Sequence, residues 1–205
     1  MNYLELIGSI IGLIYLWLEY KVSIYLWIVG IIMPAIYIFI YYKAGLYADF
    51  GINIYYLFAS VYGWIMWTYG DKFCKKRDKD ISGNDKKKEM LPISSMKLRY
   101  YMPLTITFIV TFFVIAWILI NYTNSNVPYL DSFTTALSIV GMWMLAKKNI
   151  EQWIAWVAVD GVSTGLYIYK GLYFTSILYG IYTIMAIFGY FKWKKLMKQE
   201  ALDPA

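Results

Sequence analysis

The sequence predicts an all-α integral membrane protein with seven transmembrane helices, in which one helix joins two three-helix repeats. Three observations predict this class: the composition, seven long apolar runs and an internal repeat. Of the 205 residues, 60% are hydrophobic, 20% aromatic and 16% charged, whereas soluble domains are about 45–50% apolar and about 25% charged. A helix needs about 20 apolar residues to cross a bilayer, so this length suffices for seven spans and little else.

The composition also excludes several kinds of chemistry. The chain has no histidine and a single cysteine, Cys74, which rules out an internal disulfide, a Ser-His-Asp triad and a histidine proton relay. We therefore expect no enzymatic activity, no catalytic residues, no metal site and no cofactor. The net charge of +6 is typical of membrane topology signals, so nucleic acid is not expected as a partner.

Apolar runs along the chain predict the helices. The first run has no positively charged segment before it and its first charge is Glu5, so we interpret it as a retained span rather than a cleaved signal. The predicted helices cover residues 3–20, 22–42, 47–69, 100–120, 130–146, 150–169 and 172–191. The predicted parts are a first three-helix repeat at 3–69, a charged linker at 70–99, a connecting helix at 100–120, a second three-helix repeat at 130–191, and a tail at 192–205.

The basic residues predict the orientation. The linker holds ten of the 19 lysines and arginines, and if the spans alternate, Lys21, Lys147, Lys148 and four tail lysines fall on the same side. Only Lys43 and Lys170 fall on the other side. Because positive charges collect in cytoplasmic loops, the N-terminus is expected outside and the linker and C-terminus in the cytoplasm.

A shift of 126 residues aligns the two halves without a gap. The aligned pairs include Glu5 with Asp131, Trp17 with Trp143, Trp27 with Trp153, Gly63 with Gly189, Trp67 with Trp193, and Gly45-Leu46-Tyr47 with Gly171-Leu172-Tyr173. Two units with three spans each share one orientation only if a further helix joins them, and the run 100–120 is that helix. This 3+1+3 parallel arrangement is found in the SWEET transporters, and transporters of repeated design bind substrate near the bilayer midplane, between the repeats.

The run 150–169 carries the most informative pattern. Trp153, Trp156, Asp160, Ser163 and Tyr167 follow a helical spacing and share one face. A carboxylate at mid-span costs about 2.5–3.5 kcal/mol or more in lipid, so Asp160 is expected to face a cavity or a partner. The alternatives are a hydrogen-bonded clamp between helices for Asp160 and an interfacial belt for the tryptophans.

The aligned positions of the first repeat carry related side chains. Trp27 and Tyr37 lie on the equivalent face, where Pro34 replaces Asp160 and either forms a gate or accommodates packing. The run 47–69 adds polar and aromatic residues that equally suit helix–helix hydrogen bonding. The candidate substrate-binding residues are Trp153, Trp156, Asp160, Asn53, Asp49, Trp27, Tyr37, Tyr56, Ser163, Tyr179 and Tyr182.

The chemistry of these residues points to a class of ligand. They offer carboxylates, an amide, hydroxyls and aromatic faces, and none is lysine or arginine. Aromatic faces and carboxylates attract a flat organic cation, whereas a phosphorylated ligand would require cationic donors. The pattern therefore favours an unphosphorylated heteroaromatic cation.

Four segments carry a resemblance to a known family. The Trp153-x-x-Trp156-x-x-x-Asp160 pattern, together with residues 166–173, 45–49 and 62–64, resembles the PnuC family of bacterial vitamin transporters. The resemblance implies facilitated diffusion of an unphosphorylated B vitamin across the inner membrane by alternating access. It also implies a cytoplasmic vitamin kinase as functional partner, which traps the product, and it maps the family's substrate-binding WxxW motif onto Trp153 and Trp156.

One position differs from the family pattern. Members that carry nicotinamide riboside have glutamine where this chain has Asn53, and the thiamine-type PnuT branch is also similar to this sequence. We therefore expect thiamine as the substrate. Nicotinamide riboside is the alternative, riboflavin ranks behind both, and a substrate-binding subunit of a larger pump is a second alternative.

Overall fold

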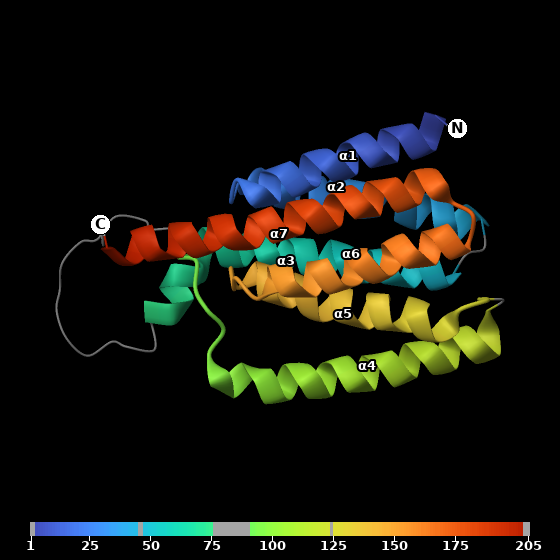
Figure 1. The fold of residues 1–205 in the computed structure, drawn as a ribbon. Coiled ribbons are helices and arrows are strands. Elements are labelled where there is room, and N and C mark those ends of the chain that lie inside the picture. The colour runs from blue at the N-terminus through green and yellow to red at the C-terminus, as the bar shows by residue number, and fades with distance from the viewer. Residues whose placement is uncertain (1–2, 45–46, 76–90, 124, 203–205) are drawn as a thin grey trace. The chain divides into compact units, whose positions relative to one another are not determined.

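The computed structural model describes residues 3–44, 47–75, 91–123 and 125–202. Within these ranges the protein is all-helical, with seven α-helices and one short 3-10 turn, η1 (Leu98–Tyr100), and with no strand (Figure 1). The helices are α1 (Tyr3–Tyr20), α2 (Tyr25–Ala44), α3 (Tyr47–Lys75), α4 (Tyr101–Tyr122), α5 (Pro128–Ala146), α6 (Gln152–Tyr169) and α7 (Tyr173–Leu202). The predicted all-α class with seven helices is confirmed.

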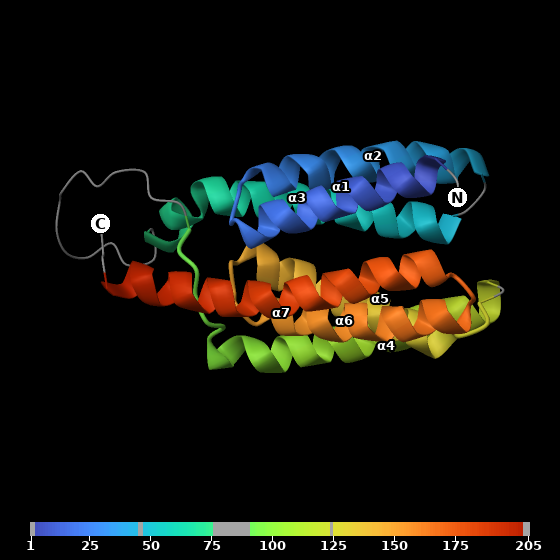
Figure 2. The ribbon, with the colours of Figure 1, turned by 45° about the horizontal axis from the view of Figure 1, so that its top comes forward.

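The chain divides into two compact units. The first comprises residues 1–92 with 146–148, and the second comprises 93–145 with 149–205. In the first unit α2 packs along α3 and α1 packs more lightly on α2, while in the second unit α6 packs along α7 (Figures 1 and 2). The connecting helix α4 belongs to the second unit, where Phe108 packs edge-on against Phe133 of α5.

The backbone repeats the pattern found in the sequence. Val22 ends the turn after α1 with a left-handed φ of 57°, and Lys148, its equivalent after α5, has a φ of 52°. The amide of Ser23 donates to the carbonyl of Leu18 at 2.9 Å, and the equivalent bond joins Asn149 to Met144 at 3.0 Å. This bond closes a Schellman motif, so both three-helix repeats end their first helix, α1 or α5, in the same way.

The largest differences from the predicted helix boundaries are at the start of α2 and at the ends of α3 and α7. Helix α3 continues to Lys75, past the predicted end at 69 and into the predicted linker 70–99, of which residues 76–90 lie outside the described residues. Helix α2 begins at Tyr25 rather than at residue 22, because the left-handed Val22 cannot continue a right-handed helix. Helix α7 continues to Leu202, beyond the apolar run that ends at 191, because lysine, glutamine and glutamate are good helix formers. Among the described residues, Leu98–Tyr122 and Tyr173–Glu200 are long and apolar enough to cross a membrane, and Ser9–Tyr20 and Tyr25–Phe39 are shorter apolar helices.

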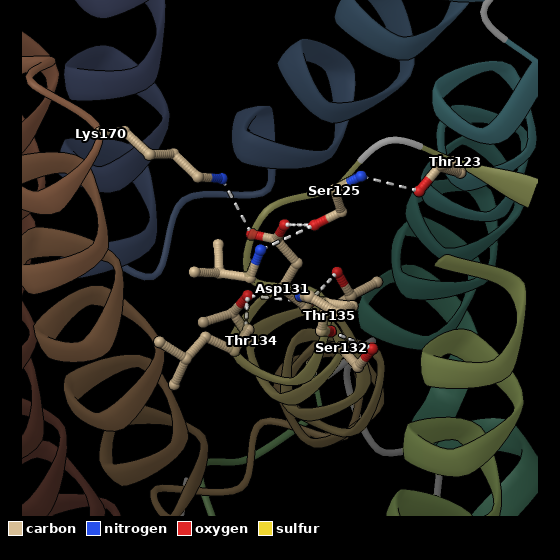
Figure 3. A network of polar contacts seen from close by, with 10 residues as sticks. Thr123, Ser125, Asp131, Ser132, Thr134, Thr135 and Lys170 are labelled. Carbon is tan, nitrogen blue, oxygen red and sulfur yellow. Dashed lines mark hydrogen bonds and ion pairs between the residues drawn. The ribbon is translucent and has the colours of Figure 1, made fainter. Parts of the chain in front are cut away.

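Polar contacts hold the start of α5 in the second unit (Figure 3). Asp131, in the first turn of α5, accepts from Lys170 Nζ at 3.2 Å and from Ser125 Oγ at 2.7 Å. Its carboxylate also lies at the helix end where negative charge is favoured. Lys170 follows α6, so this ion pair joins the end of α6 to the start of α5.

A second group of contacts fixes the segment before α4. Ser94 forms a parallel bridge with Asn149, next to the start of α6. Backbone amides of the segment 93–96 donate to the carboxylates of Glu151, at 3.0 Å, and of Glu200, at 2.9 Å. The segment is therefore attached to α6 and α7 of its own unit.

Candidate substrate-binding site

Trp153, the first tryptophan of the WxxW pattern, lies entirely inside the second unit. Its side chain is 0% exposed and packs edge-on against Trp193 of α7, with ring centroids 5.6 Å apart and an interplanar angle of 85°. A Cβ added at Gly189 would lie 2.7 Å from the indole, so only glycine leaves room for the ring. The packing gives Trp153 the surroundings of a core residue.

The first unit contains the same arrangement. Trp27 is also 0% exposed and packs edge-on against Trp67, at 5.5 Å and 86°. A Cβ at Gly63 would lie 2.2 Å from the Trp27 ring. Two units with different neighbours thus build one identical tryptophan–glycine contact, and this favours a supporting role for Trp27 and Trp153.

Trp156, the second tryptophan of the pattern, is placed differently. Its side chain is only partly buried, and its indole lies 3.5 Å from the point where a Cβ on Gly141 would stand. Its Nε1 is buried and has no hydrogen-bond partner in the described part of the chain. The Nε1 atoms of Trp27 and Trp153 are also buried without a partner among the described residues, so the partial exposure of its ring is what distinguishes Trp156.

Asp160 lies one turn further along α6. Its side chain is 8% exposed, which agrees with the expectation that it does not face lipid. The carboxylate interacts electrostatically with Tyr182 of α7 and accepts no hydrogen bond from the residues that the structure describes. Ser163 is buried on the same face, while Ile154 and Ile168 are exposed on the opposite face of the helix.

A series of ring contacts joins tyrosines of α6 and α7, and one of them, Tyr182, interacts with this carboxylate. The rings of Tyr167 and Tyr179 lie 5.0 Å apart, and those of Tyr179 and Tyr182 lie 5.5 Å apart. Ser176 Oγ donates to the Thr164 carbonyl at 3.0 Å and joins the two helices. We call Asp160, Tyr167, Tyr179 and Tyr182 the aspartate–tyrosine cluster; three of its four members are among the predicted site residues.

The candidates of the first unit are less concentrated. Tyr56 contacts Tyr55, with ring centroids 5.7 Å apart, and is partly buried, as are Asn53 and Tyr37. All three candidates interact with other residues of the protein. The side chain of Asp49 lies outside the described residues.

The structure adds two residues that the sequence interpretation missed. Gln152 is 0% exposed, and neither atom of its side-chain amide has a partner among the described residues. Its equivalent in the first unit is the buried Leu26. Gly141 is the other, because it supports Trp156. The repeat alignment could have indicated both positions, because Gln152 is aligned with an apolar leucine and Gly141 with the aromatic Tyr15.

The arrangement has a definite chemical capacity. The aspartate–tyrosine cluster and Trp156 combine one carboxylate, several aromatic faces and a free indole donor, and none of these five side chains is cationic. Aromatic faces beside a buried carboxylate attract a flat cation. The ligand class predicted from the sequence stays a prediction.

Comparison with known proteins identifies the family. Residues 2–195 match the model of a family described as nicotinamide mononucleotide transporter. The chain belongs to this family. Among similar proteins, the nicotinamide riboside transporter PnuC of Escherichia coli (strain K12) is 23% identical over 214 residues, which cover 94% of this chain and 85% of the relative. The nicotinamide riboside transporter PnuC of Neisseria mucosa is 26% identical over 95 residues, covering 42% and 35%.

A solved structure supports the fold of the family. The crystal structure of the vitamin B3 transporter PnuC matches with a TM-score of 0.64 and 22% identity, and the match covers 93% of this chain and 80% of that chain. The resemblance to the PnuC family is confirmed, and the protein is a membrane vitamin transporter of that family. The preference for thiamine receives no support, because the relatives are nicotinamide riboside transporters.

Proposed function

We propose that this member of the PnuC family takes up unphosphorylated nicotinamide riboside across the bacterial inner membrane by facilitated diffusion. A cytoplasmic kinase then traps the vitamin by phosphorylation, and the N-terminus lies outside and the C-terminus inside. The observation that carries the proposal is the buried Asp160, which interacts with Tyr182 at the end of a series of tyrosine ring contacts, in a chain whose relatives are nicotinamide riboside transporters.

The ligand and the residues complement each other. Nicotinamide riboside has a flat pyridinium ring that carries a positive charge, so its ring suits the faces of Trp156 and the tyrosines and its charge suits Asp160. A phosphate group would add about 1.5–2 negative charges beside this carboxylate. None of the five side chains is a lysine or arginine that would balance them.

Thiamine is the second candidate. Its thiazolium ring is also a heteroaromatic cation, and Asn53 stands where the nicotinamide riboside members carry glutamine. A shorter amide reaches less far by about one methylene, which in a binding site is worth about 1–3 kcal/mol. The two vitamins are therefore distinguished by affinity rather than by the type of contact.

A titration of the purified protein tests the proposal. Nicotinamide riboside, thiamine, riboflavin and nicotinamide mononucleotide are each titrated by isothermal calorimetry in the same detergent. We expect nicotinamide riboside to bind at least about tenfold more tightly than the other three, a difference of about 1.4 kcal/mol. Tighter binding of thiamine would favour the second candidate, and equal binding of the mononucleotide would contradict the role of Asp160.

A pair of variants tests the carboxylate itself. Asp160→Asn removes the charge and keeps the size, and we expect about tenfold weaker binding of nicotinamide riboside. Asp131→Asn is the matched control, because Asp131 lies in the same unit but contacts Lys170 and Ser125 instead of the cluster. Equal affinity of the two variants would show that Asp160 does not face the vitamin.

A further inference from the structure

The ring of Trp156 packs against Gly141 of α5, which has no side-chain carbon. A Cβ built on Gly141 of α5 would lie 3.5 Å from Cζ2 and 3.6 Å from Cε2 of the Trp156 indole. Cε2 is bonded to the ring nitrogen and Cζ2 is the next carbon of the six-membered ring; the N–H has no partner among the described residues. The nitrogen-bearing edge of the indole therefore lies against the backbone of α5.

In the first unit the equivalent space is filled by an aromatic ring of α1, whereas in the second unit the ring comes from α6, the equivalent of α2. Residues 15 and 30 are equivalent to 141 and 156 in the repeat. There the aromatic ring is Tyr15 of α1, and it lies 3.4 Å from the point where a Cβ on Gly30 of α2 would stand. Each unit thus places one aromatic ring between its first two helices, but in the second unit the ring comes from the helix that bears Asp160.

A third pair of equivalent residues, Ser60 and Ala186, also differs in size between the units. In the first unit, Ser60 of α3 has its Oγ 2.8 Å from the point where a Cβ on Gly30 would stand. A side chain at residue 30 would therefore collide with the hydroxyl. The equivalent of Ser60 in the second unit is Ala186, which is fully buried and lacks this oxygen. The repeat therefore predicts Ala186 beside Trp156, as Ser60 lies beside Gly30, and small residues at 141 and 186 leave room for the indole.

We propose that Gly141 and Ala186 are positioning residues that set the orientation of the Trp156 ring and thereby the selectivity of the transporter among heteroaromatic cations. This inference rests on the proposed function, in which Trp156 contacts the vitamin. Gly141 of α5 lies against one edge of the ring, and the repeat predicts Ala186 of α7 beside it, so a face of the ring is left for the ligand. The two residues act through Trp156.

Two glycines of α6 make no contact of this kind. Cβ atoms added at Gly161 and Gly165, which are exposed, would meet nothing within 4 Å. Gly161 therefore provides a matched control for Gly141.

The test measures selectivity, which a loss of stability alone would not change. Dissociation constants for nicotinamide riboside and thiamine, and the melting temperature, are measured for the wild type, Gly141→Leu, Ala186→Ser, Gly141→Ala and Gly161→Leu. In Gly141→Leu and Ala186→Ser we expect the ratio of the two dissociation constants to change by about tenfold. Gly141→Ala makes only an ordinary contact at 3.5 Å and, like Gly161→Leu, keeps the wild-type ratio.

A double variant guards against failure to fold. Gly141→Tyr with Trp156→Gly recreates the pairing of Tyr15 and Gly30 found in the first unit, and we expect a melting temperature within about 2–4 °C of the wild type together with loss of nicotinamide riboside binding. An unchanged ratio in both Gly141→Leu and Ala186→Ser would overturn the inference, as would retained binding by the double variant. A wild type that binds neither vitamin would instead overturn the proposed function.

Discussion

The two three-helix repeats share a scaffold and differ at positions that we propose bind the ligand. Both end their first helix in a Schellman motif, and both bury a tryptophan against a glycine and a second tryptophan. At two further positions they differ, since Gly30 and Pro34 of the first unit correspond to Trp156 and Asp160 of the second. The shared positions hold the helices together, and the differing positions include those that we propose supply the binding chemistry.

The difference at Pro34 and Asp160 is chemical as well as steric. Proline has no N–H, so Pro34 leaves the carbonyl of Gly30 without its usual helical donor. Asp160 keeps its N–H and adds a carboxylate inside the second unit. At this position the first unit lacks a backbone hydrogen bond, while the second unit keeps the helical backbone and carries a charged side chain.

The largest expected effect tests the shared scaffold. Trp27→Ala and Trp153→Ala each empty a fully buried site, and removal of a buried tryptophan costs about 3–5 kcal/mol. We expect similar losses in the free energy of unfolding for both, measured by chemical denaturation in detergent. A large loss for Trp27→Ala with little loss for Trp153→Ala would break the comparison between the units.

The glycines opposite these rings come next. Gly63→Ala and Gly189→Ala overpack the tryptophan contacts, which typically costs about 1–3 kcal/mol. Gly63→Ala is expected to be the more destabilising, because its Cβ would lie 2.2 Å from the ring, against 2.7 Å for Gly189. Melting temperatures measure the order, and Gly161→Ala, which meets nothing within 4 Å, serves as the control.

A third change makes the second unit more like the first. Gln152→Leu replaces a buried amide by the side chain that Leu26 supplies in the first unit. An unsatisfied buried polar group costs about 1–3 kcal/mol, so the variant is expected to melt at a higher temperature than the wild type. Destabilisation would show that the amide has a hydrogen-bond partner, such as a buried water.

The smallest expected effect concerns the contacts at the start of α5. Asp131→Asn weakens the ion pair with Lys170. The side chains of Lys170 and Asp131 are 30% and 26% exposed, and exposed ion pairs contribute about 0.2–1 kcal/mol to the free energy of unfolding. The loss should shrink further in high salt because screening already weakens the pair. A loss as large as that of Gly189→Ala would place this network among the main stabilising contacts.

The sequence predicted the helices well because the bilayer demands long apolar runs. Helix α1 spans residues 3–20 as predicted. The start of α2 escaped prediction because a β-branched residue, Val22, adopts the left-handed conformation that usually requires glycine. The end of α7 escaped it because the apolar run stops at the first lysines, although the helix continues.

The candidate site was predictable along one helix and less so between helices. Helical spacing placed Trp153, Trp156 and Asp160 on one face, and the structure buries that face fully or in part. The different surroundings of the two tryptophans depend on contacts with α5 and α7, which spacing within α6 does not contain. The repeat supplied the missing information, because residue 27 is also tryptophan whereas residue 30 is glycine.

The most direct test of the account is uptake of labelled nicotinamide riboside by proteoliposomes that contain the purified protein, without ATP or an ion gradient. The account predicts saturable uptake that ends when the concentrations inside and outside are equal. It also predicts that the Asp160→Asn variant takes up the vitamin more slowly than the wild type at low substrate concentration. Uptake no faster than in protein-free liposomes, or uptake only after an energy source is added, would contradict it.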